Sequence, residues 1–253
     1  MFSLLLACSP AQEDVLIAEL YDAGTTGITE EPGALRAFFA DDVNSNELLA
    51  RFAAFAPQFR REPDVDWEKA AREAWPPLRV GDRLFLAPSW NTEPTPAGRL
   101  RLEIHPGMAC GTGWHPCTQL CLEALERTVR PAMTVLDVGS GSGILSEAAR
   151  LLGAGAVLAC DIDLDALRVA REHVRVPMFA GSADAVRNKA ADLIVANISS
   201  AVAEDLLPDF QRIRRLGSAV IVSGFTEGDL PEGYGECDLL YREGWACLIQ
   251  RGG

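Results

Sequence analysis

The chain has 253 residues, and its 23 Lys and Arg against 36 Asp and Glu give a formal net charge of -13. That length allows one large domain or two unequal ones, and a hydrophobic fraction of 48% is that of an ordinary globular protein. An acidic chain lacks the basic surface that binds phosphates, so we expect no direct nucleic-acid binding and favour a basic protein or a small molecule as partner. The charge is uneven, because residues 1–66 hold 12 acids and four bases, a net of -8.

Targeting signals and cysteine usage suggest a cytoplasmic protein. No apolar run approaches the roughly 18 residues of a membrane-spanning helix. The apolar start at residues 2–8 has no basic segment before it, so a first strand is a better interpretation than a signal peptide. Seven cysteines without a C-x-x-C pair, together with three histidines, favour neither a disulfide framework nor a zinc site. We therefore expect a reduced protein without a metal.

Residues 1–58 are predicted to form a small α+β domain. Turn signals, glycine stops and capping residues divide this segment into short elements. The expected elements are a strand at 2–8, a helix from Ser9 to Gly24, a hairpin at 28–40 and a helix from 44 or 45 to 55. Residues 59–98 are predicted to be a connector with a helix at 67–74, short strands at 78–80 and 83–87, and a proline-rich loop at 91–98. This loop is the expected hinge, although proline can also stiffen a linker.

From residue 99 to 253 the pattern alternates between apolar strands and amphipathic helices. Near-continuous apolar strands between helices are typical of a parallel sheet that is covered on both faces. The predicted strands are 133–138, 156–162, 177–180, 193–198 and 219–223, the predicted helices are 119–127, 144–152, 165–174 and 201–213, and a hairpin is expected at 237–249. The expected fold class is therefore α/β, a doubly wound and mostly parallel sheet that ends in an antiparallel hairpin.

A glycine-rich turn follows the strand at 133–138. It has the form D-x-G-x-G-x-G from Asp137 through Gly139 and Gly141 to Gly143, and these glycines permit positive φ and close approach of a ligand. Ile144 breaks the dinucleotide fingerprint G-x-G-x-x-G. The motif instead resembles the first motif of class I S-adenosylmethionine-dependent methyltransferases. A tight turn without a ligand is the alternative.

The next predicted strand ends in acids. Asp161 lies nearest its end and is positioned to accept both ribose hydroxyls of an adenosine ligand. Asp163 and Asp165 are better interpreted as acids at a helix N-terminus. After the third strand, Ser182 or Asp184 could meet the adenine amino group.

Two further segments carry polar side chains beside the expected methyl-transfer site. The strand at 193–198 ends in Asn197 without the Pro-Pro-aromatic sequence used on planar amines, which favours a flexible aliphatic amine. A capping role for Asn197 on the helix near residue 201 is an alternative that is compatible with binding. The loop 106–118, with Trp114 and His115, is either a lid on the cofactor or an ordinary turn with a buried Trp.

The chain resembles the ribosomal protein "L eleven" methyltransferase family (PrmA-type) from about residue 66 to its end. The shared residues are Asp66-Trp67, Trp75-Pro76, Arg79-Val80-Gly81, Pro88-Ser89-Trp90, Pro106-Gly107-Met108-Ala109, Gly111-Thr112-Gly113, His115-Pro116, Thr118, the glycine motif, Asp161-Ile162-Asp163 and Ala196-Asn197-Ile198. The resemblance implies a seven-stranded Rossmann-like sheet, a small N-terminal ferredoxin-like domain that recognises substrate, and S-adenosylmethionine as cofactor. It places the cofactor contacts on Thr118, Gly139, Asp161 and Asn197, and the glycine motif adds Gly141.

The implied reaction is methylation of lysine or N-terminal α-amino groups of a large-subunit ribosomal protein. Asn197 would orient the neutral amine, and His115 is a candidate base whose alternative role is to start the following helix. The departures from the family pattern are Cys110, Trp114, Cys117 and Ser199-Ser200. Of these, Trp114 could narrow the approach of the amine. The alternatives are methylation of another protein lysine or a small amine, and a non-catalytic cofactor-binding ribosome-assembly factor. A monomer is favoured, and the N-terminal acidity would attract the basic substrate.

Overall fold

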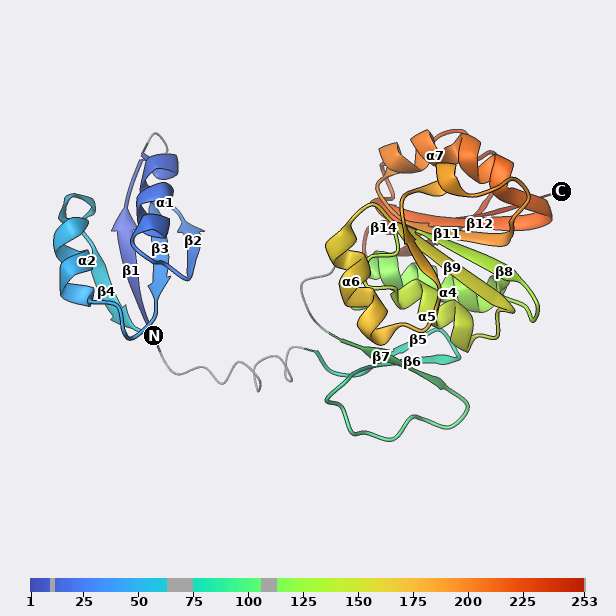
Figure 1. The fold of residues 1–253 in the computed structure, drawn as a ribbon, viewed down its shortest axis with the longest axis horizontal. Coiled ribbons are helices and arrows are strands. Elements are labelled where there is room, and N and C mark those ends of the chain that lie inside the picture. The colour runs from blue at the N-terminus through green and yellow to red at the C-terminus, as the bar shows by residue number, and fades with distance from the viewer. Residues whose placement is uncertain (10–11, 63–74, 106–112, 253) are drawn as a thin grey trace. The chain divides into compact units, whose positions relative to one another are not determined.

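A computed structural model describes residues 1–9, 12–62, 75–105 and 113–252 (Figure 1). The helix expected at 67–74 and most of the loop at 106–118 lie outside the described residues. The chain divides into two compact units, Met1–Glu73 and Ala74–Gly253. Within the described ranges, no helix combines the length and the hydrophobicity needed to cross a membrane.

The first unit is a four-stranded antiparallel sheet with two helices. Its elements are β1 (Phe2–Ala7), α1 (Glu13–Asp22), β2 (Gly27–Glu31), β3 (Ala34–Phe39), α2 (Ser45–Arg51), a 3-10 turn η1 (Ala53–Phe55) and β4 (Gln58–Arg61). The strand order β2-β3-β1-β4 with two βαβ halves is the ferredoxin-like arrangement that the resemblance implied.

Alternation along the strands builds the core of this unit. Phe2, Leu4 and Leu6 of β1 are all buried, in one cluster with residues of β3, α1 and α2. Asn44 caps α2 as expected, since its side chain accepts the N–H groups of Asn46 and Glu47. Strand β4 was not predicted because its four residues are all exposed and show no alternation. The boundary expected at residue 58 falls at the start of this strand.

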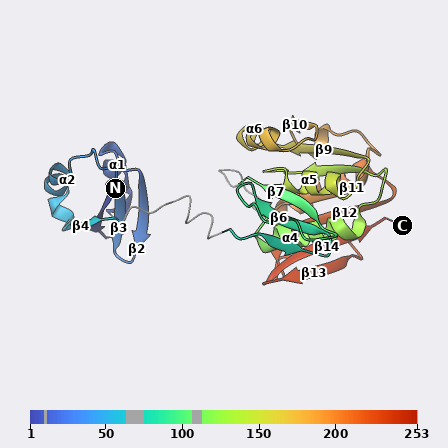
Figure 2. The same cartoon turned by 90° about the horizontal axis from the view of Figure 1, so that it is seen from below.

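The second unit contains the predicted seven-stranded sheet. Its strands are β8 (Thr134–Val138), β9 (Ala156–Asp161), β10 (Met178–Ala180), β11 (Ala191–Asn197), β12 (Arg214–Thr226), β13 (Asp238–Arg242) and β14 (Trp245–Arg251). They lie in the order β10-β9-β8-β11-β12-β14-β13, and Figure 2 shows β10 and β13 at opposite ends. Strands β8 to β12 pair in parallel, whereas β14 is antiparallel to both its neighbours. The strand order reverses between β8 and β11, which is where doubly wound sheets bind ligands.

Both faces of this sheet are covered, as near-continuous apolar strands predict. The helices are α4 (Pro116–Thr128), α5 (Ile144–Leu151), α6 (Leu164–His173) and α7 (Ser200–Ile213), with a 3-10 turn η2 (Ala183–Ala185). Val135 and Val195 enter one core cluster with α4 and α5, while their neighbours Leu136 and Ala196 enter a second cluster with α7. Successive residues of a strand therefore pack against the helices on opposite faces of the sheet.

A second, small sheet also belongs to this unit. It consists of β5 (Leu78–Val80), β6 (Leu84–Pro88) and β7 (Leu100–Ile104), with β6 and β7 parallel. Leu84, Leu86 and Leu102 are fully buried in the cluster that contains α4 and α5. The expected strands at 78–80 and 83–87 are present, and their buried residues belong to the core of the second unit. Strand β7 was not predicted.

Candidate functional site

The glycine turn joins β8 to α5 at the edge of the sheet where the strand order reverses. Gly139, Gly141 and Gly143 have φ values of 70°, 51° and 77°. A Cβ atom on Gly139 would lie 2.9 Å from Cγ2 of Ile198, so both conformation and space require glycine there. The N–H groups of Gly139 and Ser140 donate to the carbonyl of Cys160, at 2.9 and 3.1 Å, and thus tie the turn to β9.

Asp161 at the end of β9 faces this turn. Its Oδ2 accepts the N–H of Gly141 at 2.7 Å, and its Oδ1 accepts the N–H of Asp163 at 2.9 Å. The carboxylate is therefore held in place by backbone donors on both sides, with lone pairs left to accept further hydrogen bonds. Asp163 caps α6 through the N–H groups of Asp165 and Ala166, as expected for an acid at a helix start.

A cavity of about 320 Å³ opens beside the turn and Asp161. Gly139, Asp161 and Ser182 line it, so three of the predicted residues lie around one space. Asp184, the alternative to Ser182, is not among the lining residues and lies within η2. The apolar lining was missed from the sequence and comprises Val138, Ile162, Ile198, Val202 and Leu206. Val202 and Leu206 are spaced by one helical turn on α7, a signal that could have found them.

Asn197 and Thr118 meet on the neighbouring strand end. Asn197 ends β11, and the residue before it pairs with Val138, so Asn197 lies level with the start of the glycine turn. Its Nδ2 lies 3.4 Å from Oγ1 of Thr118, which is 2% exposed. The hydrogen bond uses the donor end of the amide, and the carbonyl end is the one able to accept an amine N–H. Ser199, and not Asn197, occupies the N-cap of α7, so the capping alternative is wrong.

His115 caps the helix that carries Thr118. Its Nδ1 accepts the N–H of Cys117 at 3.3 Å, and its ring lies edge-on to Trp245 with 4.6 Å between centroids. A neutral imidazole that accepts at Nδ1 carries its proton on Nε2. This arrangement favours the helix-start role for His115, and its catalytic role stays a prediction.

Asp137, the first residue of the glycine motif, is fully buried beneath the turn. Its Oδ2 accepts the hydroxyl of Ser146 at 2.6 Å, while Oδ1 has no hydrogen-bond partner among the described residues. Burial raises the pKa of Asp137 to about 6, against the opposing effect of the Ser146 hydrogen bonds. No role was predicted for this acid, although an acid inside an apolar strand is unusual enough to indicate one.

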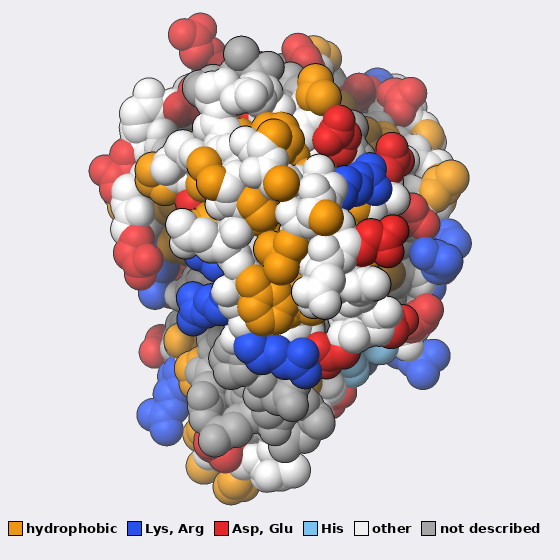
Figure 3. Space-filling model, turned by 90° about the vertical axis from the view of Figure 1, so that its left-hand side faces the viewer, with side chains coloured by type: hydrophobic (Ala, Val, Ile, Leu, Met, Phe, Trp, Pro, Cys, Tyr) orange, Lys and Arg blue, Asp and Glu red, His pale blue; other side chains and the backbone are white. Residues whose placement is uncertain are grey.

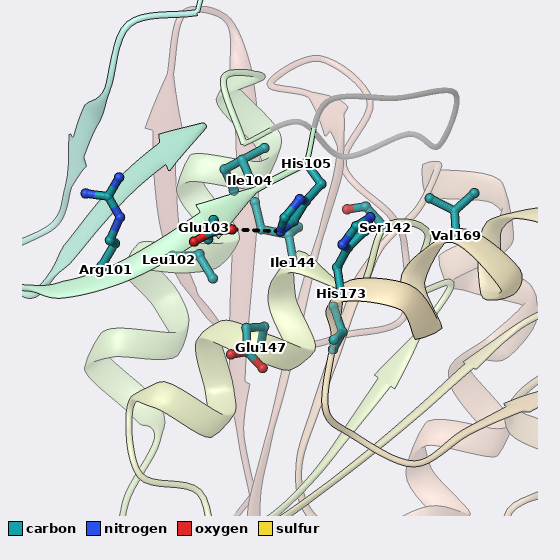
Figure 4. A pocket seen from close by; sticks show the side chains of 11 residues that line it. Arg101, Leu102, Glu103, Ile104, His105, Ser142, Ile144, Glu147, Val169 and His173 are labelled. Atoms are coloured by element: carbon teal, nitrogen blue, oxygen red, sulfur yellow. Dashed lines mark ion pairs between the residues drawn. The ribbon is translucent and has the colours of Figure 1, made fainter. Parts of the chain in front are cut away.

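A second cavity, of about 260 Å³, lies between β7, α5 and α6 (Figure 4). The imidazoles of His105 and His173 stack in it, 3.7 Å apart and 5° from parallel. His105 Nε2 also lies 3.2 Å from Oε1 of Glu103. Burial and the neighbouring His173 lower the pKa of His105, and Glu103 opposes this shift. Across the described part of the chain, no cluster of three or more His, Cys, Asp or Glu side chains is arranged to hold a metal ion.

The sheet order, the glycine turn and the acid at the end of β9 together define the fold of a class I methyltransferase. A family described as Ribosomal protein L11 methyltransferase (PrmA) matches residues 6–251, and the chain belongs to this family. The resemblance identified in the sequence is therefore confirmed, and so is the expected fold class.

Individual relatives agree with this assignment. A ribosomal protein L11 methyltransferase of Symbiobacterium thermophilum is 42% identical over 172 residues, which cover 66% of this chain and 57% of that protein. Another, of Desulfitobacterium hafniense, is 39% identical over 228 residues, covering 83% and 72%. A crystal structure of ribosomal protein L11 methylase from Lactobacillus delbrueckii subsp. bulgaricus superimposes with a TM-score of 0.63 at 30% identity, covering 71% of this chain and all of that one.

Proposed function

We propose that this protein transfers methyl groups from S-adenosylmethionine to amino groups of ribosomal protein L11, on lysine side chains or the N-terminal α-amino group. The observation that carries the proposal is the placement of Gly139, Asp161 and the Thr118–Asn197 pair around one edge of the sheet. The same activity is named for relatives that align over most of this chain. We place the protein in the cytoplasm, where such a substrate is made.

The residues of the cavity fit this cofactor. Gly139 has no side chain, so a ligand can approach its backbone closely. The carboxylate of Asp161 accepts backbone N–H groups and has further lone pairs that can accept two ribose hydroxyls. Ile198, which follows β11, and Val202 and Leu206 of α7 also line the cavity and provide apolar surface on which a planar base can pack. Ser182 on the rim is our candidate for a polar contact to the base, and Gly141 is assigned to the turn that carries the ligand's amino-acid end.

When bound, S-adenosylmethionine supplies an electrophilic methyl group on a sulfonium centre. The chain's own contribution is to align a neutral amine and to exclude water. Because an amine protonated in water must lose its proton first, an apolar surrounding helps by lowering the pKa of the amine. Asn197 is assigned to accept an N–H of the neutral amine and so aim its lone pair. His115 is assigned to the edge of this site, through its position at the start of α4.

Substrate recognition is assigned to the N-terminal ferredoxin-like unit. Its acidic side chains complement a basic ribosomal protein, and we propose that they attract it before or apart from its RNA. Narrowing of the amine's approach by Trp114 would then restrict which amines reach Asn197. Two alternatives are kept: methylation of a different protein lysine or a small amine, and a non-catalytic role in ribosome assembly.

Radiolabelled methyl transfer into ribosomal subunits from cells that lack the enzyme tests the proposal. We expect label in ribosomal protein L11, and mass spectrometry of its peptides will give the positions. Label in another protein would favour the first alternative. Measurable binding of S-adenosylmethionine without any transfer would favour the non-catalytic role.

A further inference from the structure

The tip of the C-terminal hairpin contacts the beginning of α4, far along the chain from the cavity residues. Arg242 and Trp245 are paired at this tip. The Arg242 guanidinium donates from Nη2 to Oε1 of Glu123 at 2.6 Å and from Nη1 to Oε1 of Gln119 at 3.0 Å. Trp245 supports the ring of His115 on the same helix start. The hairpin therefore contacts α4 through two side chains.

Arg242 determines which way the amide of Gln119 points. Gln119 is 8% exposed, and its Nε2 donates to the carbonyl of Trp114 at 2.7 Å. An arginine can only donate hydrogen bonds, so the oxygen of this amide must face Arg242 and its NH₂ group must face the carbonyl. If Arg242 were removed, the side chain of Gln119 would keep only its bond to the Trp114 carbonyl, and both groups would be held less firmly.

Trp114 is held on its other sides as well. Its indole Nε1 donates to the carbonyl of Pro76 at 3.1 Å, and its ring stacks on Trp75 with 5.9 Å between centroids. Trp75 stacks in turn on Trp90 at 6.1 Å. The backbone carbonyl of Trp114 immediately precedes His115, the cap of α4, so its position affects the helix turn that contains Thr118.

We propose that Arg242 is a positioning residue for methyl transfer. Acting through Gln119, it fixes the Trp114 carbonyl and thereby the start of α4, where Thr118 meets Asn197. This inference rests on the proposed function. Arg242 is not among the residues that line the cavity beside Asp161, but a displacement of about 1 Å in a reacting geometry can cost on the order of 100-fold in rate. Loss of the hydrogen bonds from Arg242 through Gln119 to the Trp114 carbonyl can therefore lower kcat more than it lowers the affinity for the cofactor.

The test compares Arg242→Gln with the matched control Arg251→Gln. Arg251 forms an ion pair with Asp238 on the same hairpin, at 3.3 Å. For Arg242→Gln we expect kcat for ribosomal protein L11 to fall about tenfold, while the cofactor Kd from calorimetry changes less than threefold. Arg242→Lys keeps the charge and one donor direction, so it should recover part of the lost kcat. The control should stay within twofold of the unaltered protein.

A double variant identifies the route. If Arg242 acts through Gln119, adding Arg242→Gln to Gln119→Ala should lower kcat no further, because the second change removes an interaction already lost. If the double variant lowers kcat by the product of the two single effects, the proposal is overturned. An Arg242→Gln enzyme with unchanged kcat and only a lower Tm would overturn it as well. Amide hydrogen exchange of residues 114–119 needs no activity: we expect it to be faster in Arg242→Gln than in the control. Equal exchange in the two variants would overturn the inference. If the unaltered protein itself transfers no methyl group to L11, that result counts against the proposed function alone.

Discussion

The buried carboxyl of Asp137 should make the stability of the second unit depend on pH. Its folded pKa of about 6 lies above the ordinary 3.8. The neutral form is thus favoured by folding, and its contribution is fully present below pH 3.8 and is lost as the pH rises through 6. Asp137→Asn stays neutral, so its free energy of unfolding relative to the unaltered protein should rise by roughly 3 kcal/mol between pH 4 and pH 8. Urea unfolding at several pH values measures this difference.

Asp192→Asn provides a control with the opposite sign. Burial favours the neutral form of Asp192, but the N–H of Thr134 and the guanidinium of Arg215 outweigh it and lower the pKa. The stability of Asp192→Asn relative to the unaltered protein should therefore be lowest above about pH 4, and the difference should shrink as the pH falls through the lowered folded pKa of Asp192. A difference for Asp137→Asn that does not vary with pH would show that folding does not raise the pKa of Asp137.

Asp161 should contribute strongly to the affinity for S-adenosylmethionine. Asp161→Ala removes a carboxylate proposed to bind the ribose and also the acceptor for the Gly141 and Asp163 N–H groups. Loss of hydrogen bonds to a charged group costs about 1.5–3 kcal/mol, so the Kd for S-adenosylmethionine should rise at least about tenfold. Calorimetry on this variant, with Asp165→Ala as control, provides the comparison. Equal affinities in the two variants would remove Asp161 from the ribose site.

Two elements, β7 and α6, are joined by the stacked rings of His105 and His173. His173→Gln removes the second cause of the lowered His105 pKa, so the pKa of His105 should rise. Because a lowered histidine pKa stabilises the fold above the unfolded value near 6.5 and loses that contribution as the pH falls through the folded pKa, the variant should lose less stability on acidification. NMR titration of the imidazole protons measures this directly, with Glu172→Gln as a control for charge near His173. A His105 pKa that stays the same in His173→Gln would contradict it.

Some helices and strands could be predicted from the sequence and others could not. The strands β8, β9, β11 and β12 were predictable because both their faces are buried, which leaves a continuous apolar run. Strand β4 is exposed throughout and left no local signal. Strand β7 alternates apolar Leu100, Leu102 and Ile104 with charged residues, so it carried a signal that the prediction missed. In the site, Gly139 and Asp161 were predictable from spacing along the chain. The contact between Arg242 and Gln119 joins residues 123 positions apart, and nothing local encodes it.

On the scale of the whole molecule, the uneven charge predicts an effect on association. Exchanging three exposed acids of the first unit, as Glu19→Gln, Asp22→Asn and Asp42→Asn together, should lower the association rate with ribosomal protein L11 several-fold and flatten its dependence on salt. The matched control neutralises Asp205, Glu227 and Glu236 of the second unit, which changes the net charge equally. Stopped-flow rates across ionic strengths provide the measurement. Equal effects of the two triple changes would show that total charge alone matters.

In Figure 3, acidic and basic side chains lie around a band of hydrophobic side chains. Charges at the edge of a contact mainly change the rate of association, whereas apolar side chains at its centre mainly change the rate of dissociation. The triple change in the first unit should therefore leave the dissociation rate nearly unaltered.

The stack of Trp90, Trp75 and Trp114 has an optical consequence. Three nearly parallel indoles about 6 Å apart couple their electronic transitions, so the folded second unit should carry a circular-dichroism couplet that single tryptophans lack. Trp114 is hydrogen-bonded at its carbonyl to Gln119 and precedes the helix turn of Thr118. The protein therefore contains an intrinsic reporter next to the proposed methyl-transfer site, and its signal should follow the local geometry without any attached dye.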